Sequence, residues 1–163
     1  MDGIKLLVTG GTLDKTYNLH NGELHFIDSH VPEILAEGRC HAGVETETLM
    51  LKDSLEMTDA DRAVIADVCN AARQQRIVIT HGTDTLTDTA EYLAVRVKDK
   101  TVVLLGAMVP WTIRHSDAAF NLGAAISAVQ CLPAGVHVVM NGRIFAAGRV
   151  RKNREEGVFE AID

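Results

Sequence analysis

Two short segments of the sequence combine glycine with hydroxyl side chains, residues 9–12 (TGGT) and residues 81–85 (HGTDT). A threonine hydroxyl attacks an amide carbon only when a neighbouring group takes its proton and N–H donors face the developing oxyanion. Thr12 and Thr83 are therefore candidate nucleophiles, and Asp84 stands directly beside Thr83. The chemistry that this pattern indicates is acyl transfer or amide hydrolysis.

The proton acceptor is the part of such a site that the two segments do not supply. An ionised carboxylate is too weak a base to activate a hydroxyl by itself, whereas a desolvated lysine held by a carboxylate is a better one. Lys152, in a basic stretch near the end of the chain, is the residue we expect beside Asp84. His81 is expected to make a structural hydrogen bond beneath the turn.

The elements around these segments predict where they lie. Residues 4–8 and 77–79 are continuous apolar runs, typical of parallel strands buried on both faces. After the second run, Leu86, Ala90, Leu93 and Val97 recur at helical spacing. Because loops at the carboxyl ends of parallel strands form the ligand crevice, both threonine segments should share one sheet edge. Helix capping alone explains either segment equally well, but the pair favours a site.

The remaining pattern predicts an α/β fold. Strands are expected at 44–51, 101–105 and 135–140, and helices at 29–37, 58–74 and 117–130. The helix at 58–74 has an apolar stripe at 60, 64, 68 and 72, and Asp117 can cap the helix at 117–130. The Asn-Gly pair at 141–142 predicts a hairpin with an antiparallel return at 143–147. Residues 13–29 are polar and irregular, with a short strand expected at 24–27, and suit a lid beside the site. The expected architecture is a parallel-rich sheet with helices on both faces.

Length and composition narrow the function classes. The 163 residues fit one domain, 1–163, and the formal charge of −6 disfavours nucleic acid as a partner. The start lacks a basic segment followed by a long apolar one, and no apolar run reaches the roughly 20 residues of a membrane span, so we expect a cytoplasmic protein. The three cysteines are widely spaced and form no CxxC motif, so we expect them to be small core residues. Four histidines at 20, 25, 30 and 41 lack metal-ligand spacing, so no metal is expected.

Several motifs together resemble the bacterial-type L-asparaginase and glutaminase family. The TGGT of 9–12 followed by Leu13, the HGTDT of 81–85, and the GAM of 106–108 followed by Pro110 all match its signatures. Asn121-Leu122 matches the family's NL, and Met140-Asn141 followed by residues 150–152 resembles its MN and VTK at the same spacing. The resemblance covers nearly the whole chain and implies the fold of the asparaginase N-terminal domain.

The resemblance also implies an activity and a set of site residues. The activity is hydrolysis of L-asparagine to L-aspartate and ammonia without a cofactor, with Thr12 as primary nucleophile. The implied catalytic set is Thr12, Tyr17 from the lid, and Thr83 with its activating pair Asp84 and Lys152. The implied substrate contacts are Ser54 to the α-carboxylate, Asp84 to the ammonium, the Ala107 carbonyl to the side-chain amide, and the positions Leu55, Gly11 and Gly82. Which of the two threonines attacks first stays open.

The departures from the family pattern carry further expectations. Leu55 stands where many members have glutamine, which favours asparagine over glutamine as substrate; Glu56 replaces an aspartate and Val109 an arginine. The family's usual second domain, which completes a neighbouring subunit's site, is expected to be absent, and a homodimer or higher oligomer is expected to cover the site. The alternatives are an inactive amino-acid-binding or regulatory domain of the same fold and, less favoured, a phosphate or nucleotide binder, for which the glycine-loop patterns are missing.

Overall fold

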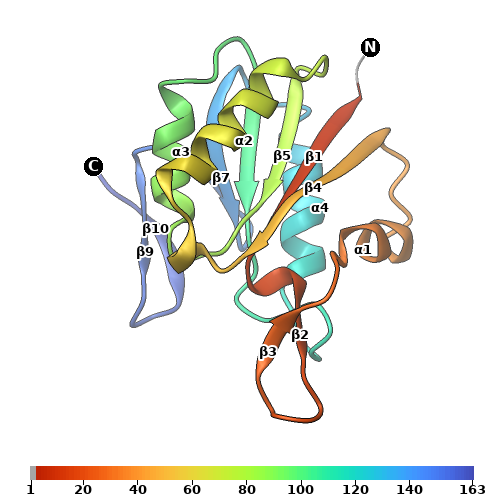
Figure 1. The fold of residues 1–163 in the computed structure, drawn as a ribbon. Coiled ribbons are helices and arrows are strands. Elements are labelled where there is room, and N and C mark those ends of the chain that lie inside the picture. The colour runs from red at the N-terminus through yellow and green to blue at the C-terminus, as the bar shows by residue number, and fades with distance from the viewer. Residues whose placement is uncertain (1–2) are drawn as a thin grey trace.

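The main sheet is mixed and parallel-rich, as the sequence predicts. The computed structural model describes residues 3–163, and their largest sheet has the strand order β4-β1-β5-β6-β7-β8 (Figure 1). All neighbours pair in parallel except β7 and β8, which are antiparallel. The strands are β1 (Ile4–Gly10), β4 (Val44–Lys52), β5 (Arg76–Thr80), β6 (Thr101–Leu105), β7 (Gly135–Met140) and β8 (Arg143–Ala146).

Helices cover both faces of this sheet and enclose two apolar cores. The helices are α1 (Val31–Glu37), α2 (Asp59–Ala71), α3 (Leu86–Ala94) and α4 (Ala118–Ala128). Leu7, Ile79 and Leu104 pack toward α2 and α3, whereas their strand neighbours face α1 and α4. This alternation follows from the twofold period of a strand, and it explains why the central strands read as unbroken apolar runs.

Two small hairpins stand outside the main sheet. The strands β2 (Lys15–Tyr17) and β3 (Leu24–Phe26) pair antiparallel and project from the body as the expected lid (Figure 1). The strands β9 (Val150–Asn153) and β10 (Val158–Ala161) form the second hairpin, which the sequence analysis did not predict. Short 3-10 turns, η1 (Thr12–Asp14) and η2 (Ser54–Glu56), follow β1 and β4. Among residues 3–163, none of the helices is long and apolar enough to cross a membrane.

The expected face of α2 is wrong. The sequence analysis placed its apolar stripe at 60, 64, 68 and 72, but Val64 is 48% exposed, whereas Ile65 and Cys69 are fully buried. Ile65 and Cys69 take the core side, Val68 and Ala72 pack partly buried at its border, and Arg62, three residues before Ile65, is buried because it finds hydrogen-bond partners. The helix also ends at Ala71, three residues before the predicted Gln74, since Ala72 is extended.

The expectation that all cysteines are core residues is also wrong. Cys69 is fully buried and Cys40 half-buried, but Cys131 is exposed in the turn after α4. Thr58 and Asp61 form the predicted capping box at the start of α2. Asp117 stands at the N-cap of α4 but makes no capping hydrogen bond, because its carboxylate is engaged elsewhere.

Candidate active site

The two threonine segments meet at the carboxyl edge of the sheet. Gly11 and Gly82 lie backbone to backbone, because a Cβ on Gly11 would stand 2.4 Å from the Gly82 nitrogen. A Cβ on Gly82 would in turn stand 2.6 Å from the Ser54 hydroxyl oxygen. Only glycine allows three loops to approach this closely, and Gly11 also has a φ of 85°. The loops after β1, β4 and β5 therefore form one surface.

A lysine, a threonine and an aspartate form the polar centre of this surface. Lys152 Nζ, carried by β9, lies 2.8 Å from Thr83 Oγ1 and 2.8 Å from Asp84 Oδ1. The Lys152 side chain is 15% exposed and that of Asp84 33%, so the ion pair is shielded but open to a small molecule. Arg154 approaches Asp84 from the same hairpin, with Nε 3.8 Å from Oδ1. The hairpin thus brings a base candidate to a hydroxyl that lies 69 residues away in sequence.

The hydroxyl groups of the HGTDT segment do not cap α3. Thr85 is its N-cap residue, yet its side chain makes no capping bond. Thr85 Oγ1 instead donates to the Ser54 carbonyl at 2.8 Å, and the Thr85 N–H donates to Ser54 Oγ at 3.3 Å. Capping alone therefore does not account for this segment, and Ser54, which is almost fully buried, is locked onto it.

The loop after β6 is organised by Asp117. Its carboxylate accepts hydrogen bonds from the N–H groups of Met108 and Val109 and from the side chains of Asn121 and Asn141, at 3.0 to 3.1 Å. Burial by itself would raise the pKa of Asp117, but these hydrogen bonds outweigh it and hold the pKa below 3.8. The buried Ala107, whose carbonyl the sequence assigns to substrate, lies inside this loop.

Three of the sequence-derived site residues are not joined to that centre. The Tyr17 side chain, 50% exposed on the lid, has its hydroxyl beside Gly22 and makes no hydrogen bond to Thr12. The Thr12 hydroxyl has no hydrogen-bond partner among the described residues. Leu55 points outward from η2 and is 65% exposed. The lid hairpin, which carries Tyr17 at the end of β2, projects away from the body of the protein (Figure 1).

The base of the lid is fixed by a buried carboxylate. Asp14 accepts hydrogen bonds from the His30 N–H at 2.7 Å and from the Ser29 hydroxyl at 3.1 Å, which ties the two ends of the lid together. Burial raises the pKa of Asp14, although both hydrogen bonds partly offset this effect. Lys15 adds an ion pair to Asp53 at 2.6 Å, next to Ser54. The lid is therefore anchored at its base and exposed at its tip.

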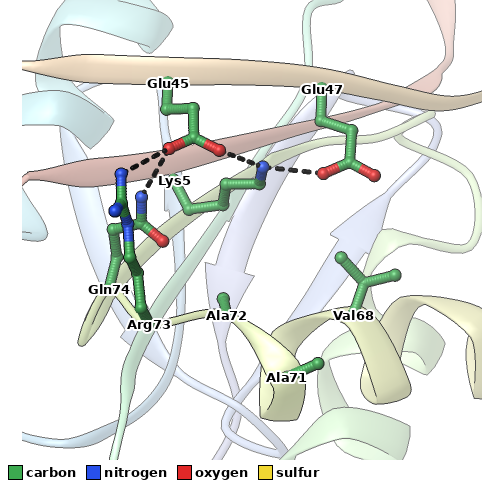
Figure 2. Close-up of a pocket in the computed structure, with 8 residues that line it drawn as sticks. All are labelled: Lys5, Glu45, Glu47, Val68, Ala71, Ala72, Arg73 and Gln74. Carbon is green, nitrogen blue, oxygen red and sulfur yellow. Dashed lines mark hydrogen bonds and ion pairs between the residues drawn. The ribbon is translucent and has the colours of Figure 1, made fainter.

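A separate hollow of about 470 Å³ lies at the opposite, amino end of the strands (Figure 2). Lys5 Nζ sits between Glu45 and Glu47 there, 2.7 Å from a carboxylate oxygen of each. Gln74 donates a further hydrogen bond to Glu45 at 2.8 Å. These polar groups pair with one another, which marks a structural cluster. No group of three or more metal-binding side chains is found within residues 3–163.

Comparisons with known proteins agree with this geometry. The family described as asparaginase, N-terminal, matches residues 3–162. The chain belongs to the asparaginase family. A relative in Haemophilus influenzae, named probable L-asparaginase periplasmic, is 31% identical over 97% of this chain and 48% of its own. A glutamyl-tRNA(Gln) amidotransferase component from Methanococcus vannielii is 32% identical over 88% of this chain and 35% of its own.

The solved structures show the same fold. The thermostable L-asparaginase from Thermococcus kodakarensis superposes with a TM-score of 0.87 at 29% identity, covering 98% of this chain and 51% of that one. The chain spans about half the length of the asparaginase relatives it matches. The cytoplasmic location expected from the sequence stays a prediction, since the Haemophilus relative is named periplasmic.

Within this asparaginase-family domain, the sequence analysis missed residues whose side chains contact the candidate site residues or the loops that carry them. Asp117 was assigned to helix capping, and Arg62 and Thr89 were not singled out at all. Arg154 was noted only as part of a basic cluster, although it contacts Asp84. The contacts of Arg62 with Thr89 and of Arg154 with Asp84 join different elements, so neither short motifs nor helical periodicity reveals them. The predicted hydrogen bond of His81 is confirmed, because its Nδ1 lies 2.7 Å from the Gly82 carbonyl oxygen.

Proposed function

We propose that this chain hydrolyses L-asparagine to L-aspartate and ammonia through an ester on a threonine. The observation that carries the proposal is the contact of Lys152 Nζ with both Thr83 Oγ1 and Asp84 Oδ1. A lysine that a carboxylate holds against a hydroxyl is the arrangement that activates an oxygen nucleophile. Membership of the asparaginase family supports the choice of an amide as substrate.

Thr12 is the proposed nucleophile, with Thr83 and Lys152 as the proton-transfer pair. The Thr12 oxygen bonds to the side-chain amide carbon, and its proton is relayed by Thr83 and Lys152 to the amide nitrogen. The C–N bond breaks as that nitrogen takes up the proton, so ammonia leaves and an aspartyl ester remains. Water repeats the sequence on the ester and restores Thr12. The chemistry balances without a metal or a cofactor.

The substrate contacts follow from the surface around this centre. Asp84, one-third exposed, is placed to bind the substrate ammonium. The Thr83 N–H makes no hydrogen bond to another described residue, which leaves it able to donate to an oxyanion. Ser54, Leu55, Gly11, Gly82 and Ala107 complete the proposed substrate-binding set. A substrate with one carboxylate, one ammonium and one amide matches these groups.

The test is ammonia release from asparagine by the wild type and by Lys152→Met. Loss of the base should lower kcat by roughly 10²- to 10⁴-fold, because proton transfer in the transition state contributes about that much. Arg151→Met is the matched control, since Arg151 directly precedes Lys152 on β9 and pairs with Glu160 instead of the site. Its turnover should stay within about twofold of the wild type. Wild-type turnover in Lys152→Met would contradict the assignment.

The acylated residue decides between the two threonines. Rapid quenching with asparagine followed by peptide mass analysis should find the added aspartyl group on Thr12. An adduct on Thr83 would reverse the two roles, and this alternative has support in the structure, because Lys152 contacts Thr83 directly.

An inactive amino-acid-binding domain is the second candidate. Its support is the position of Tyr17, which is not hydrogen-bonded to Thr12, together with an intact surface for binding. Calorimetric binding of aspartate without ammonia release from asparagine or glutamine would favour it. Ammonia release from asparagine that depends on Lys152 would exclude it.

A further inference from the structure

A buried network of three side chains runs beneath the HGTDT turn. Arg62 of α2 donates from Nε to Thr89 Oγ1 of α3 at 2.9 Å, and Thr89 Oγ1 lies 2.7 Å from His81 Nε2. The other ring nitrogen, His81 Nδ1, lies 2.7 Å from the Gly82 carbonyl oxygen. His81 and Thr89 are fully buried and Arg62 nearly so. The network therefore connects α2 and α3 to the backbone of the candidate active site.

The chemistry of these groups fixes the direction of every hydrogen bond. An arginine Nε can only donate, so Thr89 Oγ1 accepts from it and retains its own proton for another partner. The Gly82 carbonyl can only accept, so His81 Nδ1 must carry the ring proton. In a neutral ring, Nε2 is then an acceptor, and the Thr89 hydroxyl is the donor that faces it. Met57 Sδ, a weak acceptor 3.6 Å from the Thr89 hydroxyl, also lies 3.0 Å from His81 Nε2, where it would accept the ring proton if the Gly82 carbonyl did not hold that proton on Nδ1.

Charge supports the same tautomer. Burial, together with the nearby Arg62 guanidinium, lowers the pKa of His81 to about 4, although the hydrogen bond to Gly82 opposes this shift. The ring is therefore neutral at pH 7. A neutral histidine has one donor and one acceptor nitrogen, and the Gly82 carbonyl, which can only accept, assigns the proton to Nδ1.

The orientation of one peptide group follows from this tautomer. In a trans peptide the carbonyl and the next N–H point in opposite directions, and the described chain has no cis bonds. Since the Gly82 carbonyl is held toward His81, the Thr83 N–H points away from the core. That N–H has no acceptor within the described part of the protein.

We propose that Arg62 and Thr89 are positioning residues that fix His81 as the Nδ1–H tautomer and thereby hold the Thr83 N–H toward the oxyanion. The kinetic part of this inference rests on the proposed amidohydrolase function, whereas the tautomer can be observed in the resting protein. If Nε2 carried the proton instead, the Nδ1 lone pair would face the Gly82 carbonyl oxygen. That repulsion would favour rotation of the Gly82–Thr83 peptide and misdirect the N–H.

The first measurement is the tautomer of His81 by two-bond ¹H–¹⁵N correlation spectroscopy of ¹⁵N-histidine-labelled protein at pH 7. The wild type should show a single Nδ1–H pattern for His81, and this arm needs no variant that could fail to fold. An Nε2–H pattern or an averaged pattern in the wild type would overturn the proposal. If the predicted tautomer is found in a protein that releases no ammonia, the hydrogen-bond network is correct and the proposed function fails.

The second measurement uses Thr89→Val, which keeps the side-chain shape and removes the hydroxyl. Without that donor, the Nδ1–H pattern should give way to Nε2–H or to a mixture, and kcat should fall about 10- to 100-fold with KM little changed. Removing an oxyanion donor entirely costs about 10²- to 10³-fold in kcat, and a misdirected donor should cost less. Thr89→Ser restores the hydroxyl and should restore both the tautomer and kcat.

Thr87→Val is the matched control, because it makes the same substitution on α3 outside the network. It should leave the His81 pattern and kcat unchanged. Arg62→Met removes the first donor and should shift the tautomer less than Thr89→Val, since the Thr89 hydroxyl can still donate to His81. A folded Thr89→Val protein with the wild-type tautomer and wild-type kcat would overturn the proposal.

Discussion

Asp117 offers the sharpest test of how the loop after β6 is held. Asp117→Asn keeps the size of the side chain but replaces one carboxylate oxygen with an amide nitrogen. The remaining oxygen can still accept from the Met108 and Val109 N–H groups, at 3.0 and 3.1 Å. The new amide then faces the Nδ2 donors of Asn121 and Asn141, each 3.0 Å from the oxygen that is lost. Two donors would oppose one another at both contacts.

The expected cost follows from the burial of the two partners. A hydrogen bond to a charged group contributes about 1.5–3 kcal/mol when buried, and Asn121 is fully buried. Asn141 is exposed, so its bond should contribute only about 1 kcal/mol because water replaces it. Asp117→Asn should therefore lower the free energy of unfolding by about 3 kcal/mol. For a chain of this size that corresponds to a fall in Tm of about 6–12 °C.

The assay is urea and thermal unfolding at pH 7, with Asn141→Gly as control. Glycine suits the φ of 48° at position 141 and removes the exposed bond to Asp117 together with a longer bond of 3.3 Å to Asn121 Oδ1, so this variant should lose about 1 kcal/mol. Because the folded pKa of Asp117 is lowered, its stabilisation is present above pH 4 and is lost as the pH falls through the folded pKa. The gap between wild type and Asp117→Asn should close below pH 4. Equal stability of the two variants at pH 7 would refute the reasoning.

Three further predictions address specificity, assembly and pH. The wild type should favour asparagine over glutamine in kcat/KM by roughly 10- to 200-fold, the range that one methylene allows, and Leu55→Gln should narrow the ratio; an unchanged ratio would remove Leu55 as the cause. Light scattering should find a homodimer or larger oligomer, and a fully active particle of about 17.7 kDa would disprove this. Because burial lowers the pKa of His81 to about 4, the His81 side chain of the unfolded chain binds a proton below pH 6.5, whereas that of the folded chain stays neutral until about pH 4. The free energy of unfolding should therefore fall between pH 6.5 and 4 by on the order of 3 kcal/mol more in the wild type than in His81→Gln, and parallel curves would contradict this.

The strands were the most predictable part of the fold. The runs at 4–8, 77–79 and 101–105 are apolar at nearly every position, which only strands buried on both faces require, and each is a central strand of the sheet. The Asn-Gly pair at 141–142 predicted the antiparallel turn into β8, which is confirmed. These signals are local, so a single sequence contains them.

The errors arise where burial depends on a distant partner. Arg62 reads as a solvent-facing charge on α2, but Thr89, 27 residues away, makes its burial possible. The same holds for Asp117, whose partners include Asn141, 24 residues away. The placement of Lys152 beside Asp84 was predicted correctly, since chemistry demanded a base and few candidates existed. The role of the lid tyrosine was assigned by resemblance and stays a prediction, because Tyr17 and Thr12 share no hydrogen bond in the described part of the chain.

The cluster around Lys5 affects how readily the protein aggregates through the edge of its sheet. The strand β4 is an outer strand of the sheet, and its first half, from Glu45 to Thr48, is exposed. A free strand edge is a template on which other chains can add strands and aggregate. The ion-paired side chains of Lys5, Arg73 and the two glutamates lie beside that edge, and a strand added from another chain would have to take these charges out of water (Figure 2). The charged side chains thus oppose the addition of a strand from another copy at this edge of the sheet.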